Sequence, residues 1–538
     1  MRWVRVLLAV PFAMAAPIVP VVHVASGTLA GKVLGSTSVF QGIPFAAPPV
    51  GDLRWRPPQP VANWSGIRDA TNAGSPCMQS TYGVDSFLAP LAAEYGVHYA
   101  MEALKPSEDC LYLNVFSPAA AKRLPVMVWL HGGSNRAGSG SGDGYDGASL
   151  ASHGVIVVTM NYRLGAMGFF AHPGLTAESP HHSSGNYGLL DQIAGLKWVQ
   201  QNIEQFGGDP GNVTLFGESA GSVDATMLMA SPLVKGLFRR VIAESGPAFG
   251  LGPPVMLAQA EAVGKAINTA AALRKMPAQQ VAELDARMVA SRFKGFDPNS
   301  AVVDGWLLPR PPAVAFASGS TQKVDLMAGF NGRELSAFRI VAEAAATAPP
   351  KEPATAAVKK LADAAYPLYG AWTDMAVGMY LAQILVHGNS AVDRASNDML
   401  VACPVGAEIA LVTRLGARAY LYRFDRSIPG KGEQKLGAFH ALELPFVFQT
   451  FSSRSWRWLP VTQADRNLSA VMESYWTNFA KSGDPNGAGL PVWKAWNSDD
   501  EPYLQFSPSA VAVPQRSFAP PFCHLGADRL RERLGGGR

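Results

Sequence analysis

Apolar runs of strand length alternate with a helical segment in the middle of this chain, and no other feature restricts the possible folds so strongly. The runs at 124–130 (LPVMVWL), 155–160 (VIVVTM) and 213–216 (VTLF) are nearly continuous and rich in β-branched residues. Runs that are apolar on both faces are typical of buried, mainly parallel strands. The segment 189–206 lies between the last two runs, and its apolar residues recur every three or four positions, as in a helix. This order predicts an α/β fold with a central, mostly parallel, twisted sheet flanked by helices.

The rest of the chain fits one domain built on this sheet. Further strands are predicted at 324–328 and 419–423. The Ala-rich segments 251–300 and 340–400 are predicted to form helical caps over the carboxyl edge of the sheet, where a lid and a substrate pocket are usually built. The stretch 42–60 contains many prolines, so we expect an ordered loop without regular secondary structure.

The first sixteen residues are typical of a signal peptide. Arg2 and Arg5 precede an apolar run, and the small-x-small sequence AMA at 13–15 is typical of a signal peptidase site. The run is too short to span a bilayer, although a buried first strand or an anchor would also fit it. We therefore expect a secreted or periplasmic protein without stable membrane insertion, with a signal peptide at 1–16 and a single domain at 17–538.

Charge and motif content argue against several classes of function. The chain has 45 Lys and Arg against 41 Asp and Glu, a net charge of +4, and its basic residues form no cluster along the sequence. Nucleic-acid binding is therefore not expected. The sequence has no zinc, P-loop or dinucleotide motif, so no metal or organic cofactor is expected. None of these features specifies the oligomeric state.

A serine motif directly follows the run at 213–216. The sequence GESAG at 217–221 matches G-x-S-x-G and precedes a helical stretch. In a strand-turn-helix of this kind the serine sits on a strained turn, and the two glycines allow close approach of neighbouring backbone. The turn places Ser219 at a helix N-terminus, which favours developing negative charge. Ser219 is therefore the candidate nucleophile, against the alternative of a simple glycine-rich turn.

A second glycine-rich turn follows the run at 124–130 and reads HGGS at 131–134. Its backbone N–H groups can face inward at close range because glycine leaves room for them. We predict that the N–H groups of Gly133 and Ser134 form an oxyanion hole together with the N–H of Ala220. An ordinary strand-exit turn is the alternative.

Several longer segments resemble those of type-B carboxylesterases, the family that includes cholinesterases and several lipases. They read FQGIPFA at 40–46, PPVG at 48–51, SEDCLYLN at 107–114, NYR at 161–163, GNYGL at 185–189 and FGGDP at 206–210. The resemblance implies an α/β-hydrolase fold. It also implies hydrolysis of small-molecule carboxylic esters through an acyl-serine intermediate.

The resemblance implies the other two members of a catalytic triad. The acid is Glu334, the last residue of GFNGRE at 329–334, and the base is His440 in GAFHALELPF at 437–446. The chain order of nucleophile, acid and base then agrees with that of α/β-hydrolases.

Other titratable residues are interpreted as structural. Asp304 and Glu443 are the rival acids, and both are expected to stabilise local structure. His131 is expected to pack beneath the loop that follows its strand, and His387 lies in a helical pattern. His181 and His182 are adjacent and lack the partner spacing of metal ligands.

Four cysteines suggest two disulfides if the chain is exported, and the residues alone leave three possible pairings. The resemblance implies Cys77–Cys110, which closes an early loop. It also implies Cys403–Cys523, which ties the C-terminal segment to the body of the domain.

The sequence departs from the family pattern at three places. Ser134 stands where a third glycine is usual, so we expect esters of bulky tertiary alcohols to be poor substrates. Leu335 stands where a glycine often follows the acid. Between Cys77 and Cys110 there is no tryptophan of the kind that binds choline by a cation–π contact, so choline esters are not the first expectation.

Ester hydrolysis has two alternatives. The same site could cleave amides or carbamates, and some relatives with this fold are non-catalytic binding modules that have lost triad residues. The natural substrate, its acyl-chain length and its alcohol are not specified by the sequence.

Overall fold

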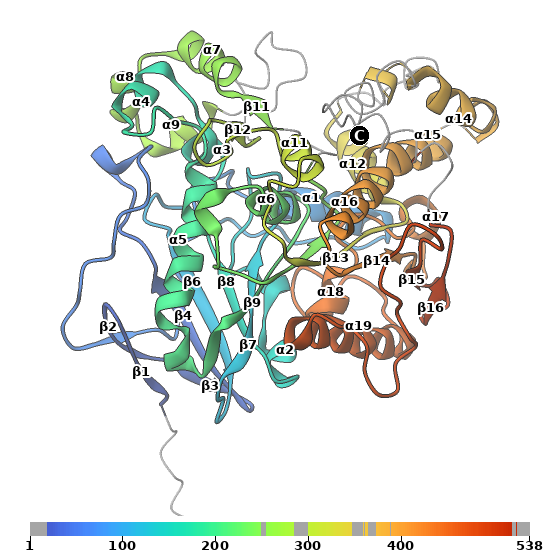
Figure 1. The fold of residues 1–538 in the computed structure, drawn as a ribbon, viewed down its shortest axis with the longest axis horizontal. Coiled ribbons are helices and arrows are strands. Elements are labelled where there is room, and N and C mark those ends of the chain that lie inside the picture. The colour runs from blue at the N-terminus through green and yellow to red at the C-terminus, as the bar shows by residue number, and fades with distance from the viewer. Residues whose placement is uncertain are drawn as a thin grey trace, which may run out of the picture.

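An eleven-stranded sheet lies at the centre of the computed structural model, which describes residues 19–248, 254–284, 300–346, 359, 361–363, 373–387, 389–518 and 523 (Figure 1). The strand order is β16-β15-β14-β13-β10-β9-β7-β8-β6-β4-β3. Neighbouring strands run parallel from β15 to β8, whereas β16 at one edge and β6, β4 and β3 at the other pair antiparallel. The strands are β3 (Lys32–Leu34), β4 (Thr37–Pro44), β6 (Tyr112–Pro118), β7 (Leu124–Leu130), β8 (Ile156–Met160), β9 (Gly208–Glu218), β10 (Arg240–Glu244), β13 (Asp325–Asn331), β14 (Ala419–Phe424), β15 (Tyr503–Phe506) and β16 (Ala512–Gln515).

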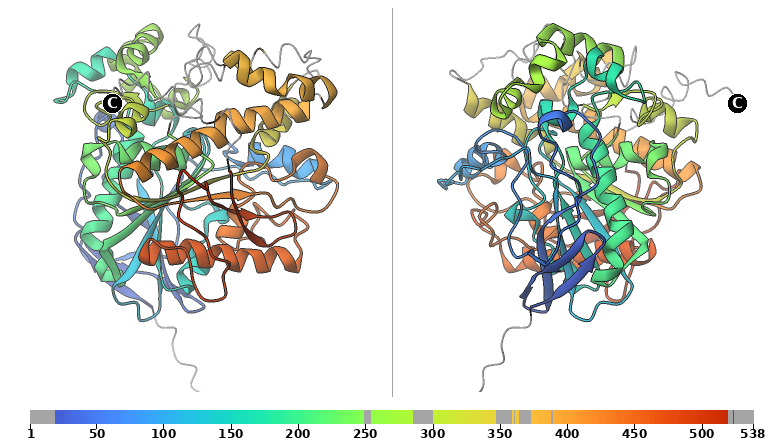
Figure 2. Two further views of the ribbon diagram at one scale, coloured as in Figure 1. Left: turned by 45° about the vertical axis from the view of Figure 1, so that its right-hand side comes forward. Right: turned by 90° about the vertical axis from the view of Figure 1, so that its left-hand side faces the viewer.

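Helices cover both faces of this sheet (Figure 2). Val126 and Val128 of β7 belong to the same buried cluster as Leu196 of α5 (Tyr187–Asn202). The alternate residues Met127 and Trp129 belong to a second cluster with Met472 of α19 (Gln463–Ser482). Successive side chains of a strand point to opposite faces, so a strand covered on both sides must be apolar throughout. This requirement explains the continuous apolar runs in the sequence.

The predicted core elements are confirmed with small shifts of their ends. The three apolar runs form β7, β8 and β9, and the helical segment forms α5 followed by a short 3-10 turn, η3 (Ile203–Phe206). The later strand predictions correspond to β13 and β14. The architecture is therefore the predicted α/β-hydrolase fold.

The prediction of a stretch without regular structure at 42–60 is wrong at two places. Strand β4 continues to Pro44, and Gly51–Leu53 forms a 3-10 turn, η1. Proline is tolerated at the end of β4 because β3 pairs only with Thr37–Val39, so this end of β4 has β6 on one side only. At such a position the missing N–H breaks no ladder hydrogen bond.

Helical segments cap the sheet where they were expected. The first contains α7 (Leu257–Ile267), α8 (Ala270–Arg274) and α9 (Ala278–Ala282), and the second contains α12 (Glu334–Ala345), α14 (Thr373–His387) and α15 (Asn389–Asn397). They form two groups in the upper part of Figure 1. Strand β11 (Val255–Met256) pairs with β12 (Val302–Val303) and joins the two ends of the first cap. Parts of both predicted segments lie outside the described residues.

One stretch of helix in the described chain, Ala391–Arg414, is long and apolar enough to cross a membrane. Most of that window, 72%, is buried within the fold, which is equally typical of a core helix. The predicted signal peptide at 1–16 lies outside the described residues. The described chain begins just before β1 (Val21–Val24), which pairs with β2 (Gly27–Ala30) in a small separate sheet.

Candidate active site

Ser219 lies on the turn between β9 and α6 (Ala220–Met229) and has φ 54° and ψ −123°. A positive φ is unfavourable for a residue with a side chain. The turn is held by its surroundings, since the Ser219 N–H donates to the Glu244 carbonyl at 2.8 Å. A Cβ atom at Gly217 would lie 2.6 Å from the backbone of Gly221, and one at Gly221 would collide with the Leu130 carbonyl. The strained strand-turn-helix predicted from the motif is therefore present.

The glycine-rich turn after β7 lies against this serine. A Cβ atom at Gly132 would lie 3.1 Å from the Cβ of Ser219. Gly133 has φ 105°, and its carbonyl accepts the N–H groups of Arg136 and Ala137 at 3.0 and 3.1 Å, which folds the loop back on itself. Only glycine adopts this conformation readily.

Three N–H groups remain available around Ser219. Gly133 and Ser134 donate no backbone hydrogen bond to any residue that the structure describes. Ala220 is the first residue of α6, where an N–H has no carbonyl within the helix to accept it. These are the three groups predicted to form the oxyanion hole.

The side chains of His440 and Glu334 are hydrogen-bonded to one another. The His440 Nδ1 atom lies 2.6 Å from Glu334 Oε2, and both side chains are buried. Glu334 follows β13 and begins α12, while His440 comes from the loop between α17 (Glu433–Leu436) and α18 (Leu444–Val447). The structure thus brings together two residues that are 106 positions apart in the chain.

The position of Glu334 is fixed by two further bonds. Its Oε1 atom accepts the Asn331 N–H at 2.6 Å. Its own N–H donates to the side-chain oxygen of Asn397, the last residue of α15, at 2.9 Å. A carboxylate held in this way can keep the imidazole in one tautomer and orientation.

The second nitrogen of His440, Nε2, lies 3.1 Å from Glu218 Oε1. Among the described residues, the Ser219 side chain has no hydrogen-bonding partner in this arrangement. Hydrogen bonds between nucleophile and base are often long without substrate and tighten in the reacting complex. Glu218 was missed as a site residue by sequence reasoning, because the variable position of G-x-S-x-G does not reveal where its side chain points.

Buried carboxyl groups of Glu218, Glu334 and Glu443 lie close to the imidazole, and Glu244 lies near Glu218. Burial raises the pKa of Glu218 to about 7 and that of Glu244 to about 8. Burial alone would lower the pKa of His440, but the negative charges of Glu218 and Glu334 raise it to about 9. The site therefore favours the imidazolium ion, the form that the base adopts when it has taken a proton from the nucleophile.

The rival acids have structural partners. Asp304 accepts the N–H groups of Trp306 and Leu308 at 3.0 and 2.9 Å and closes a turn. Glu443 accepts hydrogen bonds from Asn331 and from Ser245. Neither carboxylate is hydrogen-bonded to the candidate base, which agrees with their interpretation as structural.

The histidine at the start of the glycine-rich turn is also structural. His131 stacks on Tyr162 with ring centroids 4.5 Å apart, and burial lowers its pKa to about 4. His181 is an exposed loop residue, and its ring stacks on that of Trp306 with the ring centroids 3.8 Å apart.

An aromatic wall lies beside the candidate base. The Phe338 ring centroid is 4.8 Å from that of His440, and Phe87 lies 6.3 Å from the same ring and 5.6 Å from Phe338. Phe338 is about one-third exposed, at 36%. An apolar side chain next to the base excludes water on that side and offers a surface to an apolar group of a substrate.

A cavity of about 660 Å³ opens next to the oxyanion loop. Its lining includes Arg136 and Ala137 of that loop, Gln79 and Thr81, and Gln279 and Glu283 from the region of α9. Gln79 makes two hydrogen bonds to Gly138. Its Nε2 donates to the Gly138 carbonyl at 2.8 Å, and its Oε1 accepts the Gly138 N–H at 2.9 Å. The loop that carries the predicted oxyanion hole therefore forms one wall of this cavity.

Both predicted disulfides are present, Cys77–Cys110 and Cys403–Cys523. Within the described part of the chain, no group of three or more His, Cys, Asp and Glu side chains is arranged to hold a metal ion.

Comparisons with known proteins agree on one family. The family model described as "Carboxylesterase family" matches residues 18–521. The fumonisin B1 esterase of Sphingopyxis macrogoltabida is 36% identical, over 88% of this chain and 83% of its own length, and the human cocaine esterase is 33% identical, over 89% and 87%. A solved structure of a PNB esterase has a TM-score of 0.77 at 31% identity, and a carboxylesterase of Geobacillus stearothermophilus has a TM-score of 0.77 at 32% identity. In both cases the match covers 96% of this chain and 99% of the other.

Proposed function

Because the chain belongs to the carboxylesterase family and is a carboxylester hydrolase, we propose that Ser219, His440 and Glu334 carry its reaction as nucleophile, base and acid. The observation that supports this assignment best is the 2.6 Å bond between His440 and Glu334 beside the strained turn of Ser219. The substrate class is a small-molecule carboxylic ester.

The first half of the proposed reaction forms an acyl-enzyme. His440 Nε2 takes the Ser219 proton while Oγ attacks the ester carbonyl carbon. Glu334 holds the imidazole and stabilises its charged form. The oxyanion is received by the N–H groups of Gly133, Ser134 and Ala220, and the alcohol leaves with the proton from His440.

The second half returns the free enzyme. Water gives a proton to His440 and attacks the acyl carbon bonded to Ser219, again with the oxyanion held by backbone donors. The bond to Ser219 then breaks, its oxygen recovers the proton, and the acid is released.

The test is the loss of the nucleophile. We expect Ser219→Ala to reduce hydrolysis of p-nitrophenyl acetate by about 10⁴-fold or more, with unchanged circular dichroism and thermal unfolding. Ser152→Ala, which removes an exposed hydroxyl on α2 (Ala148–Ser152), is the matched control and should retain wild-type turnover. Turnover near wild type in Ser219→Ala would exclude the proposed mechanism.

Cleavage of amides or carbamates is the second candidate, because the same residues can attack any activated acyl group. Turnover of an ester and of the amide that matches it in acyl group and leaving group would separate the two activities. A non-catalytic binding module is disfavoured, since this chain retains all three triad residues.

The aromatic wall of Phe87 and Phe338 supports an ester with an apolar acyl or alcohol group. Two of the similar esterases are named for fumonisin B1 and for cocaine. A panel of p-nitrophenyl esters of increasing chain length would define the preference. A maximum at the shortest chain would contradict an apolar acyl subsite.

Export is also part of the proposal. The basic start and apolar run at 1–16 support a signal peptide, and the two disulfides fit an oxidising compartment. N-terminal sequencing of the protein recovered outside the cytoplasm should begin near residue 17. Recovery of the intact chain from the cytoplasm alone would contradict this assignment.

A further inference from the structure

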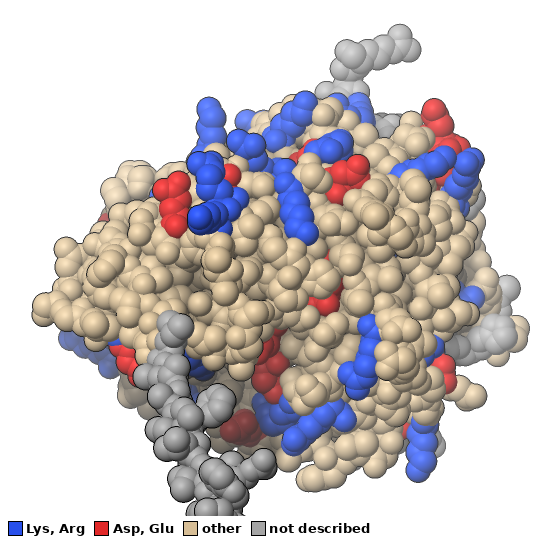
Figure 3. Space-filling model, turned by 90° about the horizontal axis from the view of Figure 1, so that it is seen from below, with Lys and Arg blue, Asp and Glu red and all other residues tan. Residues whose placement is uncertain are grey.

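The surface charge is unevenly distributed. Figure 3 shows a band of Lys and Arg side chains across the upper part of the face seen from below, with Asp and Glu beside some of them, and smaller groups of Lys and Arg in the lower half. A cavity of about 820 Å³ has a strongly basic lining. Its charged residues are Lys235, Arg239, Arg240, Arg310, Lys323 and Asp325.

This basic cavity lies away from the candidate active site. Arg240 and Asp325 begin β10 and β13 and face one another in the parallel register. Ser219 and Glu334 instead follow the carboxyl ends of β9 and β13. The length of β13, about 20 Å for seven residues, separates the two edges of the sheet.

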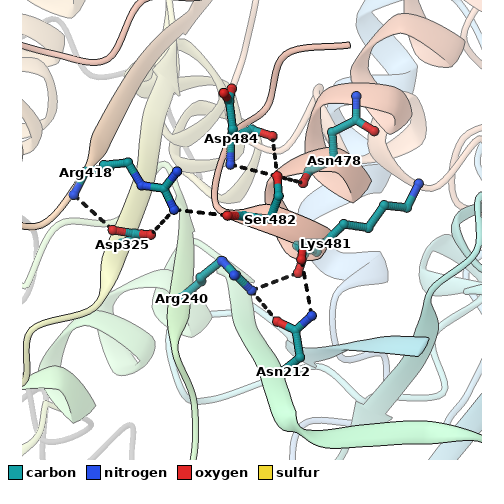
Figure 4. A network of polar contacts seen from close by, with 9 residues as sticks. Asn212, Arg240, Asp325, Arg418, Asn478, Lys481, Ser482 and Asp484 are labelled. Carbon is teal, nitrogen blue, oxygen red and sulfur yellow. Dashed lines mark hydrogen bonds and ion pairs between the residues drawn. The ribbon is translucent and has the colours of Figure 1, made fainter. Parts of the chain in front are cut away.

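The cavity's positive charge is poorly compensated by protein groups. Its single carboxylate, Asp325, already accepts the backbone N–H and the Nη2 of Arg418 at 2.9 and 2.7 Å (Figure 4). In the described chain, no acidic side chain pairs with any of the four exposed cations: Lys235, Arg239, Arg310 and Lys323. Like charges in one concave site raise its potential and attract anions.

Arg240 lines this cavity, while its guanidinium group is held against the end of α19 and Asn212. Its side chain is only 8% exposed, and its Nη1 donates to the Ala480 carbonyl at 2.9 Å and to the Asn212 side chain (Figure 4). Its Nε is buried without an acceptor among the described residues. Burial lowers the pKa of Arg240 and the nearby negative charge of Asp325 opposes this shift, so the one carboxylate of the cavity is shared between Arg240 and Arg418.

A hydroxyl in the same wall is also unsatisfied. Thr321 Oγ1 is buried and has no hydrogen-bond partner in the described part of the structure. The neighbouring Gln322 is fixed by two bonds, from its N–H to the Met229 carbonyl at 2.9 Å and from its side chain to the Ser231 carbonyl at 3.3 Å. The segment around Thr321 that lines this wall is therefore held in place before any ligand arrives.

We propose that this cavity, at the amino ends of β10 and β13, binds a small polyanion through its phosphate groups. Four exposed cations, Lys235, Arg239, Arg310 and Lys323, with Arg240 as the fifth, supply the positive charge that phosphate oxygens require. The volume exceeds that of a single phosphate ion, so a ligand with two or more phosphates, or a phosphate on a larger body, fits the site best. The phosphate could belong to a soluble molecule or to a lipid headgroup.

The test uses pyrophosphate as the soluble probe. Calorimetric titration of the full mature protein at about 0.15 M ionic strength should show one saturable site. Ser219→Ala should bind equally well, because the two sites are at opposite edges of the sheet. The triple variant Lys235→Gln, Arg310→Gln, Lys323→Gln should weaken binding by about tenfold or more while ester hydrolysis stays at wild-type level.

A matched triple variant controls for net charge. Lys122, Lys197 and Lys494 are exposed, and none has an acidic partner in the described structure. Their replacement by glutamine removes the same charge from other surfaces and should leave the affinity within about twofold. Equal weakening by both triple variants would mean a general charge effect and would overturn the proposal.

Vesicles distinguish the two sources of phosphate. Sedimentation with phosphatidylglycerol and phosphatidylcholine vesicles, compared with pure phosphatidylcholine, measures headgroup binding. Loss of pyrophosphate binding in the Lys235 triple variant supports a site for a soluble phosphate ligand. Loss of vesicle binding in the same variant supports a site for a lipid headgroup. Absence of binding to both probes in the wild-type protein would overturn it.

Discussion

At the residue scale, Glu218 controls the protonation of the base more closely than its place in the motif suggests. Its carboxylate lies 3.1 Å from His440 Nε2, the nitrogen that must take the proton from Ser219. Burial opposes a charged imidazole, yet Glu218 and Glu334 together raise the pKa of His440 to about 9. Since only neutral imidazole can act as a base, activity should rise with pH towards about 9.

The variant Glu218→Gln tests this control. Removing the carboxylate removes the charge that contributes most to raising the pKa of His440. The acid limb of kcat/KM should therefore move to lower pH by about one unit. The measurement is the pH profile of p-nitrophenyl acetate hydrolysis. Glu204→Gln, at an exposed position in η3, makes the same change of net charge and should not move the limb. An unmoved limb in Glu218→Gln would contradict the role assigned to this carboxylate.

Ser134 gives a second prediction at this scale. It has φ 57°, a conformation that suits the glycine usual at this position in the family. Ser134→Gly removes a side chain next to the predicted oxyanion donors, so the ratio of tertiary-ester to primary-ester turnover should increase by about tenfold. Ala120→Gly relaxes a similar φ of 58° outside the candidate site and should leave the ratio unchanged. The same ratio in both variants would show that Ser134 does not restrict the alcohol.

At the scale of elements, helix α15 positions the candidate acid from the cap. The Asn397 side chain accepts the Glu334 N–H at 2.9 Å, and a π-helical turn at Asp398–Ala402 follows directly. Such turns are often found at functional sites. Asn397 is buried, so the loss of its oxygen would leave the Glu334 N–H without a partner.

Asn397→Leu should therefore lower kcat about tenfold with little change in KM, because the acid shifts while the substrate pocket remains. Asn397→Asp retains an oxygen acceptor and should recover most of kcat. The readouts are steady-state kinetics and the pH profile. Glu334 raises the pKa of His440, so a displaced Glu334 raises it less and the pKa of His440 should fall. A change confined to thermal stability would reduce Asn397 to a structural residue.

The same scale shows what sequence patterns can specify. The strands from β7 to β9 were predictable because burial on both faces demands continuous apolar runs, and the serine turn was predictable because its glycines have steric causes. The continuation of strand β4 to Pro44 was not predictable, since the sequence does not show that this end of β4 has a neighbouring strand on one side only. The position of Glu218 beside His440 depends on a loop more than 200 residues away, which local patterns do not reveal.

At the scale of the whole molecule, the basic cavity illustrates the same limit. Its charged lining comes from three separate segments, 235–240, 310 and 323–325, so no cluster of Lys and Arg is visible along the chain. Five cations and one carboxylate give it a net charge of 5 − 1 = +4, as large as that of the entire protein. A small net charge therefore does not exclude a strongly charged site.

The two disulfides connect different parts of the molecule and should have different effects. Cys77–Cys110 closes a loop between residues 33 apart, and Gln79 within that loop is bonded twice to Gly138 after the oxyanion turn. Cys403–Cys523 joins residues 120 apart and anchors the C-terminal segment on α16 (Cys403–Arg414). The first is therefore close to the chemistry, whereas the second constrains much more of the unfolded chain.

Pairwise Cys→Ser variants should separate these roles. In the chain-entropy model, removing the 120-residue link costs about 5 kcal/mol and removing the 33-residue link about 4 kcal/mol. We expect the Cys403–Cys523 variant to lose more unfolding free energy in urea but to keep kcat at 25 °C. We expect the Cys77–Cys110 variant to lose kcat, because Gly138 and the donors before it are no longer held by Gln79. Equal kcat in the two folded variants would show that the early loop does not support the oxyanion turn. A greater loss of stability for Cys77–Cys110 would contradict the order expected from loop length.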